Sequence, residues 1–125
     1  MAATSHSVLT PLADIEVIDT AVTNTAVANA SASSGTCTLY YVEVDNSANT
    51  SATYLKMVRA TSATPSSTGP DTILSAPGGT VAYFAFPTGM DHLYLTYWAT
   101  STAANGTSQT APSTAITARF LCKNS

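Results

Sequence analysis

The sequence predicts an all-β domain, and three of its features support this. Charged residues make up only 9% of the 125 residues, whereas an ordinary soluble domain has about 25%. Serine and threonine are abundant, and the β-branched threonine suits the solvent face of a strand. Short alternating stretches are separated by clusters of turn-forming residues. We therefore expect an antiparallel β-sandwich of about seven or eight short strands, with a small β-barrel as the alternative.

The N-terminal region differs from the rest of the chain. Residues 14–20 alternate between apolar and polar side chains, as a half-buried strand would. The remainder of 1–34 is polar or rich in Ala, Asn, Ser and Thr, up to Gly35. We interpret residues 1–34 as an extended N-terminal arm with one early strand. Residues 35–125 are expected to form the β-sandwich, and the chain is short enough for both parts to belong to one domain.

The clearest strand signals follow the arm. Residues 36–45 and 52–61 are rich in β-branched and aromatic residues, and the turn-forming sequence DNSANTS separates them. This pattern predicts two antiparallel strands joined by a loop. Residues 61–72 contain two prolines and a glycine, which predicts a surface loop. A short strand is expected at 72–75.

The C-terminal half predicts three further strands. Residues 81–86 follow a Pro-Gly-Gly turn and are expected to form an aromatic strand that is broken at 87–89. Residues 91–100 carry large side chains on both alternating sets, so both faces of this strand should be at least partly covered. After a polar loop, residues 114–123 alternate again and predict a final strand that ties the C-terminus into a sheet.

The charge and hydropathy pattern excludes several classes of partner. The net charge is −3 with only four basic residues, which is too few to follow a phosphate backbone, so we expect no nucleic acid partner. No apolar stretch approaches the roughly 20 residues that span a bilayer, and the first ten residues lack the pattern of an export signal. We therefore expect no membrane association.

The two cysteines allow two interpretations. Cys37 and Cys122 each lie in a strand-like stretch, so a disulfide could join them if the strands are neighbours. The alternative is a pair of buried thiols. Because nothing in the sequence indicates an oxidising compartment, the buried thiols are favoured.

Residues that could carry chemistry are scattered. His6 and His92 are far apart, and no metal-binding spacing surrounds either of them. Asp91 and His92 are not accompanied by the local signature of a nucleophile. The acidic residues could include a carboxylate pair or calcium ligands, but solvated strand faces and strand ends explain them more simply. These residues are Asp14, Glu16, Asp19, Glu43 and Asp45. We predict neither an enzyme nor a cofactor.

Aromatic residues gather in the C-terminal half. They are Tyr83, Phe84, Phe86, Tyr94, Tyr97 and Trp98. A flat row of exposed rings could hold a sugar, which makes carbohydrate binding a real alternative. Rings at strand spacing more often belong to a core or to an interface.

From residue 54 onward the chain resembles a type of small structural protein of tailed bacteriophages. The similarity extends over residues 40–123 and consists of a YLK-type strand, a Ser/Thr/Pro loop, a Pro-Gly-Gly turn, an aromatic strand, DHLYLTYWAT and a last strand after a Thr/Ala/Pro-rich loop. Its most specific parts are DNSANTSATYLK and the PGG turn. The resemblance implies a virion component that is made in the host cytoplasm and added to the head or tail.

This resemblance implies a capsid decoration or cement protein that binds the outer surface of the shell of major capsid protein, or another virion protein. The sheet edges contain few charged or proline residues to block further pairing, so we also expect a homo-oligomer, a dimer or a trimer. Shell contacts are expected in or near the arm, and the loops at 61–72 and 100–113 should face outward. The expected contact residues are His6, Leu9, Leu12, Ile15 and Val17. The alternative is a tail or fibre module that binds host-surface carbohydrate.

Overall fold

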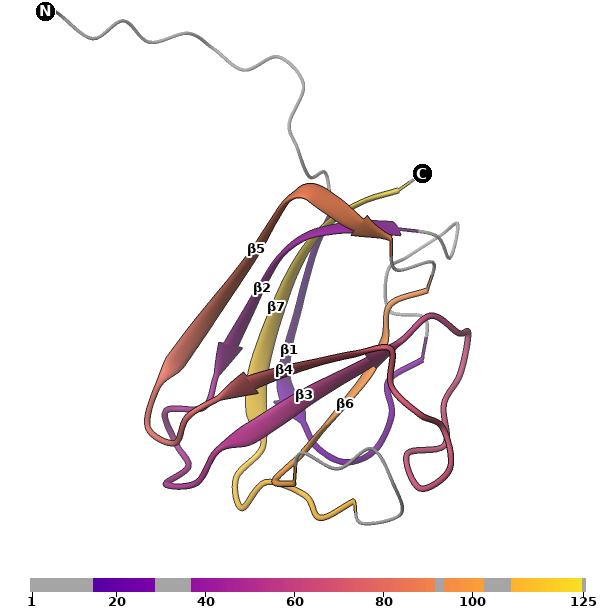
Figure 1. The fold of residues 1–125 in the computed structure, drawn as a ribbon. Helices are drawn as coiled ribbons and strands as arrows, with labels where there is room; N and C mark the ends of the chain where they lie inside the picture. The colour runs from indigo at the N-terminus through magenta and orange to yellow at the C-terminus, as the bar shows by residue number, and fades with distance from the viewer. Residues whose placement is uncertain (1–14, 29–36, 92–93, 103–108, 125) are drawn as a thin grey trace, which may run out of the picture.

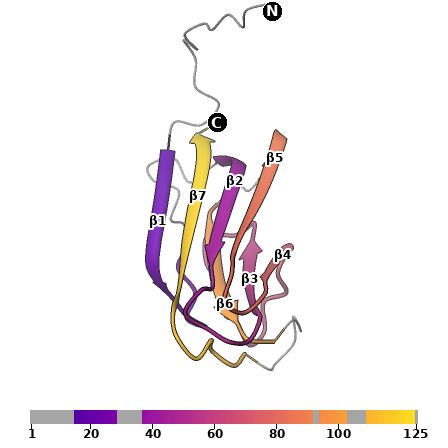
Figure 2. The same ribbon diagram turned by 90° about the vertical axis from the view of Figure 1, so that its left-hand side faces the viewer.

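The computed structural model describes residues 15–28, 37–91, 94–102 and 109–124. In this part of the chain, seven strands form two antiparallel sheets that face each other (Figures 1 and 2). The four-stranded sheet has the order β1-β7-β2-β5, and the three-stranded sheet has the order β4-β3-β6. The predicted all-β sandwich is confirmed, and the sheets do not close into a barrel. The strands are β1 (Ile15–Val22), β2 (Cys37–Asp45), β3 (Thr53–Val58), β4 (Thr72–Ala76), β5 (Val81–Asp91), β6 (Thr96–Thr100) and β7 (Ile116–Asn124).

The core lies between the two sheets and follows from the alternation of the strands. Along β7, every second side chain from Ile116 to Cys122 is buried. The ring of Phe120 packs against that of Tyr97 from the opposite sheet, with centroids 4.7 Å apart. Leu55 and Met57 of β3 are buried in the same cluster. One apolar face from each sheet therefore encloses a single core.

The predicted pairing of residues 36–45 with 52–61 is wrong. Both stretches are strands, β2 and β3, but they belong to different sheets. β2 pairs with β5 and β7, whereas β3 pairs with β4 and β6. The loop between β2 and β3 crosses from one layer of the sandwich to the other (Figure 1). Alternation identifies a strand with one buried face, but it does not say which strand pairs with it.

The predicted break at 87–89 is also wrong, because β5 runs through Pro87 to Asp91. β5 is an edge strand, where a residue without an N–H group is tolerated. The chain accommodates the proline by a shift of register between Leu39 and Tyr41 on β2 and by a positive φ of 83° at Gly89. The strand bends here instead of ending.

The strand predicted at 91–100 is shorter in the structure, where β6 spans Thr96–Thr100. Residues 92–93 lie outside the described part of the chain. Tyr97 and Trp98 point to opposite faces of β6, and both are buried. The expectation that both faces of this strand are covered is confirmed.

The N-terminal segment takes part in both sheets. β1 pairs with β7 at the edge of the four-stranded sheet. The chain then turns to run beside β6, where Ala99 N donates to Thr23 O at 2.8 Å and Val27 exchanges two backbone hydrogen bonds with Tyr97. Residues 15–28 are therefore part of the sandwich and close one of its sides. The early strand predicted at 14–20 is β1, an edge strand of the domain.

Candidate functional site

The outer face of the four-stranded sheet combines apolar, aromatic and charged side chains. The register of the strands places two rows of side chains across this face. We call these eight residues the outer-sheet face. The first row is Ile18 (β1), Arg119 (β7), Glu43 (β2) and Tyr83 (β5), and the second row is Glu16, Leu121, Tyr41 and Ala85 on the same strands.

The two ends of this face are apolar and exposed. Ile18 on the edge strand β1 is 54% exposed, and Tyr83 on the edge strand β5 is 63% exposed. The rings of Tyr83 and Tyr41 stack with centroids 6.3 Å apart and an angle of 30° between their planes. Large apolar groups that remain accessible after folding are available to contact another molecule.

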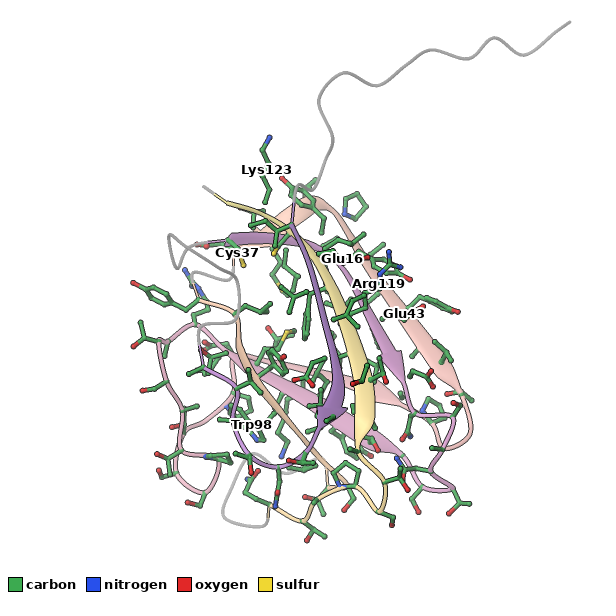
Figure 3. All side chains as sticks on the ribbon, turned by 180° about the vertical axis from the view of Figure 1, so that it is seen from behind. Glu16, Cys37, Glu43, Trp98, Arg119 and Lys123 are labelled. Carbon is green, nitrogen blue, oxygen red and sulfur yellow. The ribbon has the colours of Figure 1, made fainter. Side chains whose placement is uncertain are left out.

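The centre of the face is charged. Arg119 lies between Glu16 and Glu43 (Figure 3). Its Nε and Nη2 atoms both lie 2.5 Å from Oε2 of Glu16, and this hydrogen bond, with the charge of Glu16, raises the pKa of Arg119. The two side chains are 39% and 42% exposed, so water screens their attraction and the pair contributes little to stability.

The tyrosine at the centre of the second row is also affected by these charges. The pKa of Tyr41 is raised, chiefly by desolvation and then by the nearby Glu43 and Tyr83, while Arg119 acts in the opposite direction. Tyr41 is therefore a neutral hydroxyl at physiological pH. The Tyr41 side chain is half-buried near the centre of the face.

The outer face of the three-stranded sheet, in contrast, is covered over β3 and β6, although Ile73 on the edge strand β4 remains exposed. Lys56 and Trp98 are cross-strand neighbours there, and both are fully buried. Loop residues lie over this face: Trp98 Nε1 donates to Gln109 Oε1 at 3.1 Å, and Thr96 Oγ1 donates to Ala60 O at 2.5 Å. Desolvation lowers the pKa of Lys56. Sequence reasoning missed this burial because a lysine on a strand is ordinarily solvated.

A network of buried polar groups joins the loops at one end of the sandwich. The Nδ2 atom of Asn46 lies 3.0–3.2 Å from the carbonyl oxygens of Ser51, Ala76 and Pro77. Its Oδ1 atom accepts from Asn49 Nδ2 at 2.8 Å and from Thr53 Oγ1 at 2.9 Å. Asn46, Asn49 and Thr53 are all buried. We call these three residues and their partners the Asn46 junction.

The Asn46 junction also binds the two turns beside it. Asn49 exchanges hydrogen bonds with the backbone of Thr114, at 2.9 and 2.8 Å. The N–H of Gly79 donates to the carbonyl oxygens of Asn46 and Asn49, and a Cβ atom at Gly78 would overlap the carbonyl of Thr50. DNSANTSATYLK and the PGG turn therefore meet here. In this chain they hold loops together.

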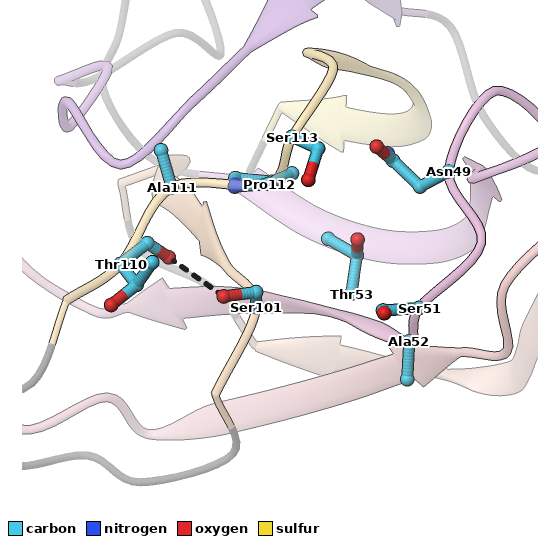
Figure 4. Close-up of a pocket in the computed structure, with 9 residues that line it drawn as sticks. All are labelled: Asn49, Ser51, Ala52, Thr53, Ser101, Thr110, Ala111, Pro112 and Ser113. Atoms are coloured by element: carbon cyan, nitrogen blue, oxygen red, sulfur yellow. Dashed lines mark hydrogen bonds between the residues drawn. The ribbon is translucent and has the colours of Figure 1, made fainter.

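A small polar pocket lies beside the junction (Figure 4). It has a volume of about 160 Å³ and is lined by Asn49, Ser51, Ala52, Thr53, Ser101, Thr110, Ala111, Pro112 and Ser113. Asn49 and Thr53 already make internal hydrogen bonds. Ser101 Oγ donates weakly to Thr110 O at 3.4 Å. Because the lining residues carry no charge, the pocket offers small polar contacts and no acid or base.

The predicted partner-binding residues divide into two groups. Ile15 and Val17 are half-buried and pack against the core on the inner side of β1, so the structure places them within the chain's own sandwich. Leu9 and Leu12, together with His6, lie outside the described residues.

The cysteines lie close together in the sheet. Leu39, two residues after Cys37 on β2, is in register with Cys122 on β7. Both cysteines are fully buried, and they form no disulfide.

The predicted aromatic cluster does not form one surface. Tyr97 and Trp98 are buried, and Phe84 and Phe86 pack against the core. Tyr94 is half-buried. Tyr83 is the exposed member of the set and belongs to the outer-sheet face with Tyr41. The identity of Tyr41 as its partner depends on the strand register and could not be read from the sequence.

The acidic residues do not converge on one site. Asp19 accepts the Tyr97 hydroxyl at 2.8 Å, and Asp45 accepts the hydroxyl of Ser47 at 2.6 Å, which lowers the pKa of Asp45. Within residues 15–28, 37–91, 94–102 and 109–124, no group of three or more His, Cys, Asp or Glu is placed to hold a metal ion. Asp14 and His92 lie outside these ranges. The described residues also contain no helix that is long and apolar enough to cross a membrane.

Comparison with protein-family models, curated proteins and solved structures finds no match to this chain.

Proposed function

We propose that the protein is a non-enzymatic structural protein of a tailed-bacteriophage virion. In this proposal it is a decoration or cement protein that binds the outer surface of the capsid shell and stabilises it. The observation that carries the proposal is the outer-sheet face, where exposed Ile18 and Tyr83 flank a charged centre. Apolar and aromatic groups beside charged groups on a broad surface are the chemistry of protein interfaces.

The sequence resemblance supports the virion setting, and the fold supports the structural role. A cement protein stabilises a shell by binding the assembled form, so its effect grows with its affinity for that form. Leu9 and Leu12, which precede β1, are the expected shell contacts in this proposal. They are apolar residues that come before the edge strand β1 in the sequence.

The direct test is binding to expanded capsids that lack the protein. Purified protein is mixed with these particles, which are then sedimented, and the bound copies are counted. We expect saturable binding in a fixed ratio to the capsid protein, together with greater resistance of the particles to heat. Absence of binding to capsids would contradict the proposal.

The contribution of the N-terminal residues has its own test. In the same assay, the double substitution Leu9→Ser and Leu12→Ser should reduce binding strongly, whereas Ser7→Ala should not. Both variants retain the strands of the sandwich, because the changes precede β1 (Ile15–Val22). Unchanged binding of the double variant would contradict the predicted shell contacts.

A second candidate function is the binding of host-surface carbohydrate by a tail or fibre module. The specific observation in its favour is the exposed ring of Tyr83 stacked on Tyr41 and beside Glu43, because an aromatic face with nearby hydrogen-bonding groups suits a sugar ring. A glycan array probed with the purified protein tests it. Binding that is lost in Tyr83→Ser and kept in Ile73→Ser, an exposed apolar control on the other sheet, would favour this function.

A further inference from the structure

The outer-sheet face carries a pattern that is complementary to itself. Across the four strands, the first row runs from an apolar residue, Ile18, to a cation, Arg119, then to an anion, Glu43, and then to an aromatic residue, Tyr83. Reversal of this order places an apolar group opposite an apolar group and a cation opposite an anion. We propose that a second copy of this chain docks on the outer-sheet face and forms a two-fold symmetric dimer.

The order of the strands defines where the two-fold axis must lie. An axis parallel to the strands, in the plane of contact and between β7 and β2, brings β7 of one copy over β2 of the other and β1 over β5. Arg119 then faces Glu43 of the second copy, and symmetry makes this contact twice. Ile18 faces Tyr83 in the same way.

The second row agrees with the same axis. Leu121 of one copy meets Tyr41 of the other, so an apolar side chain packs on an aromatic ring at the centre of this row. Glu16 comes opposite Ala85, a small side chain on the edge strand β5. Glu16 keeps its own Arg119 as an ion-pair partner in each copy, so it needs no second one.

The charges also argue against the other axis in this plane. An axis that runs across the strands would exchange the two rows and place Arg119 opposite Leu121 and Glu43 opposite Tyr41. Arg119 would then be desolvated against an apolar side chain, and neither charge would meet an opposite charge on the second copy, which is costly. The pattern of charges therefore selects the axis that is parallel to the strands.

The groups that would pair between copies are available for pairing. Within the part of the chain that the structure describes, Glu43 makes no ion pair. Arg119 binds Glu16 through Nε and Nη2, and the guanidinium has further N–H donors on Nη1. Arg119 can therefore hold Glu16 of its own copy and Glu43 of the other at the same time.

The size of the face indicates a dimer that depends on concentration. Four strands about 4.8 Å apart and about eight residues long cover roughly 500 Å². Two copies would then bury about 1,000 Å² in total, which is at the lower limit for specific interfaces. This inference rests on the proposed function in one respect: the outer-sheet face joins two copies of the assembling protein, and the shell contacts are left to the residues that precede β1. Its test needs no capsid.

The test uses charge reversal and sedimentation velocity. The wild-type protein should dimerise, whereas Arg119→Glu alone and Glu43→Arg alone should each weaken dimerisation at least tenfold, because like charges then face each other twice. An equimolar mixture of these two variants should form a heterodimer, since every pair across that interface is again of opposite charge. A matched control is Arg59→Glu, which reverses an exposed, ion-paired arginine away from the face and should leave the dimer intact.

Two outcomes would overturn the inference. One is a wild-type chain that stays monomeric at millimolar concentration, and the other is a mixture that stays monomeric while the wild-type chain dimerises. If a single variant fails to fold by circular dichroism, the double variant Glu43→Arg with Arg119→Glu keeps the net charge and restores opposite charges across the interface. It loses the ion pair with Glu16, so it should dimerise more weakly than the wild type but more strongly than a single variant that folds. If the chain is monomeric and binds capsids, this inference is wrong and the proposed virion function is supported. If the chain dimerises but binds no capsid, this inference is supported and the proposed virion function is wrong.

Discussion

The Asn46 junction and the outer-sheet face are both rich in polar groups, but these groups are buried in the junction and exposed on the face. In the junction, Asn46 is fully buried and both ends of its amide are bonded inside the chain. On the face, Arg119 and its partner Glu16 remain about two-fifths exposed. Polar groups that folding removes from water serve the fold, and those that stay in water are available to a partner.

The difference has an energetic consequence. A buried polar group that loses its partner costs about 1–3 kcal/mol, whereas an exposed ion pair contributes about 0–1 kcal/mol. Substitutions in the junction should therefore lower the free energy of unfolding. Substitutions on the face should leave it nearly unchanged and alter association.

The largest effect is expected for Asn46→Ala. The change removes the donor to the carbonyls of Ala76 and Pro77 and the acceptor for Asn49 and Thr53. Several buried groups lose their partner together, so we expect a loss of about 3–5 kcal/mol in the free energy of unfolding, measured by urea denaturation. A loss below about 1 kcal/mol would show that the junction is not central to the fold.

A smaller effect is expected for Gly78→Ala in the neighbouring turn. The new methyl group would overlap the backbone carbonyl of Thr50, so the turn must move away from the Asn46 junction. We expect a loss of about 1–3 kcal/mol, by the same measurement. Gly69→Ala is the matched control, because a Cβ atom there meets nothing within 4 Å, and equal losses in the two variants would refute the steric explanation.

Tyr97→Phe should cost about 1 kcal/mol, because the hydroxyl donates to Asp19. The variant should also change the response to alkali. Burial, with the hydrogen bond to Asp19, raises the pKa of Tyr97 above its usual value of 10.0, so its contribution to stability is complete below about pH 10 and is lost as the pH rises further. The difference in urea midpoint between wild type and variant should therefore shrink above pH 10, and a constant difference would contradict this.

The smallest effect on stability is expected for Tyr83→Ser, on the outer-sheet face. The ring is mostly exposed, so the free energy of unfolding of the monomer should change by less than about 0.5 kcal/mol. Dimerisation should nevertheless weaken about tenfold, because the ring meets Ile18 of the second copy in the proposed interface. Sedimentation equilibrium measures this loss. An unchanged dimerisation affinity would show that Tyr83 is not part of the interface.

The sequence predicted the class of fold and most of the strands, because a strand that buries one face has apolar and polar residues in alternation. It did not predict the pairing of the strands. The partners of β2 lie far along the chain in β5 and β7, and local pattern carries no information about such distant contacts. The passage of β5 through Pro87 depended on the position of that strand at a sheet edge, which only the topology reveals.

The candidate site was predictable only in part. Tyr83 belonged to the aromatic set that the sequence singled out, but Glu16 and Arg119 are 103 residues apart in the chain and meet only through the register of β1 with β7. The burial of Lys56 escaped prediction for a similar reason, since it depends on loops that fold back over Trp98. Contacts between residues on different strands cannot be predicted until the pairing of those strands is known.

The measurement that tests the account most directly is the urea unfolding midpoint as a function of protein concentration, for the wild-type chain and for Tyr83→Ser. A dimer that forms through the outer-sheet face links folding to association, so the wild-type midpoint should rise with concentration. For Tyr83→Ser the same rise should begin only at about tenfold higher concentration, and at low concentration its midpoint should equal the wild-type value. A wild-type midpoint that does not depend on concentration, or a variant whose midpoint rises over the same concentrations as that of the wild type, would contradict the account.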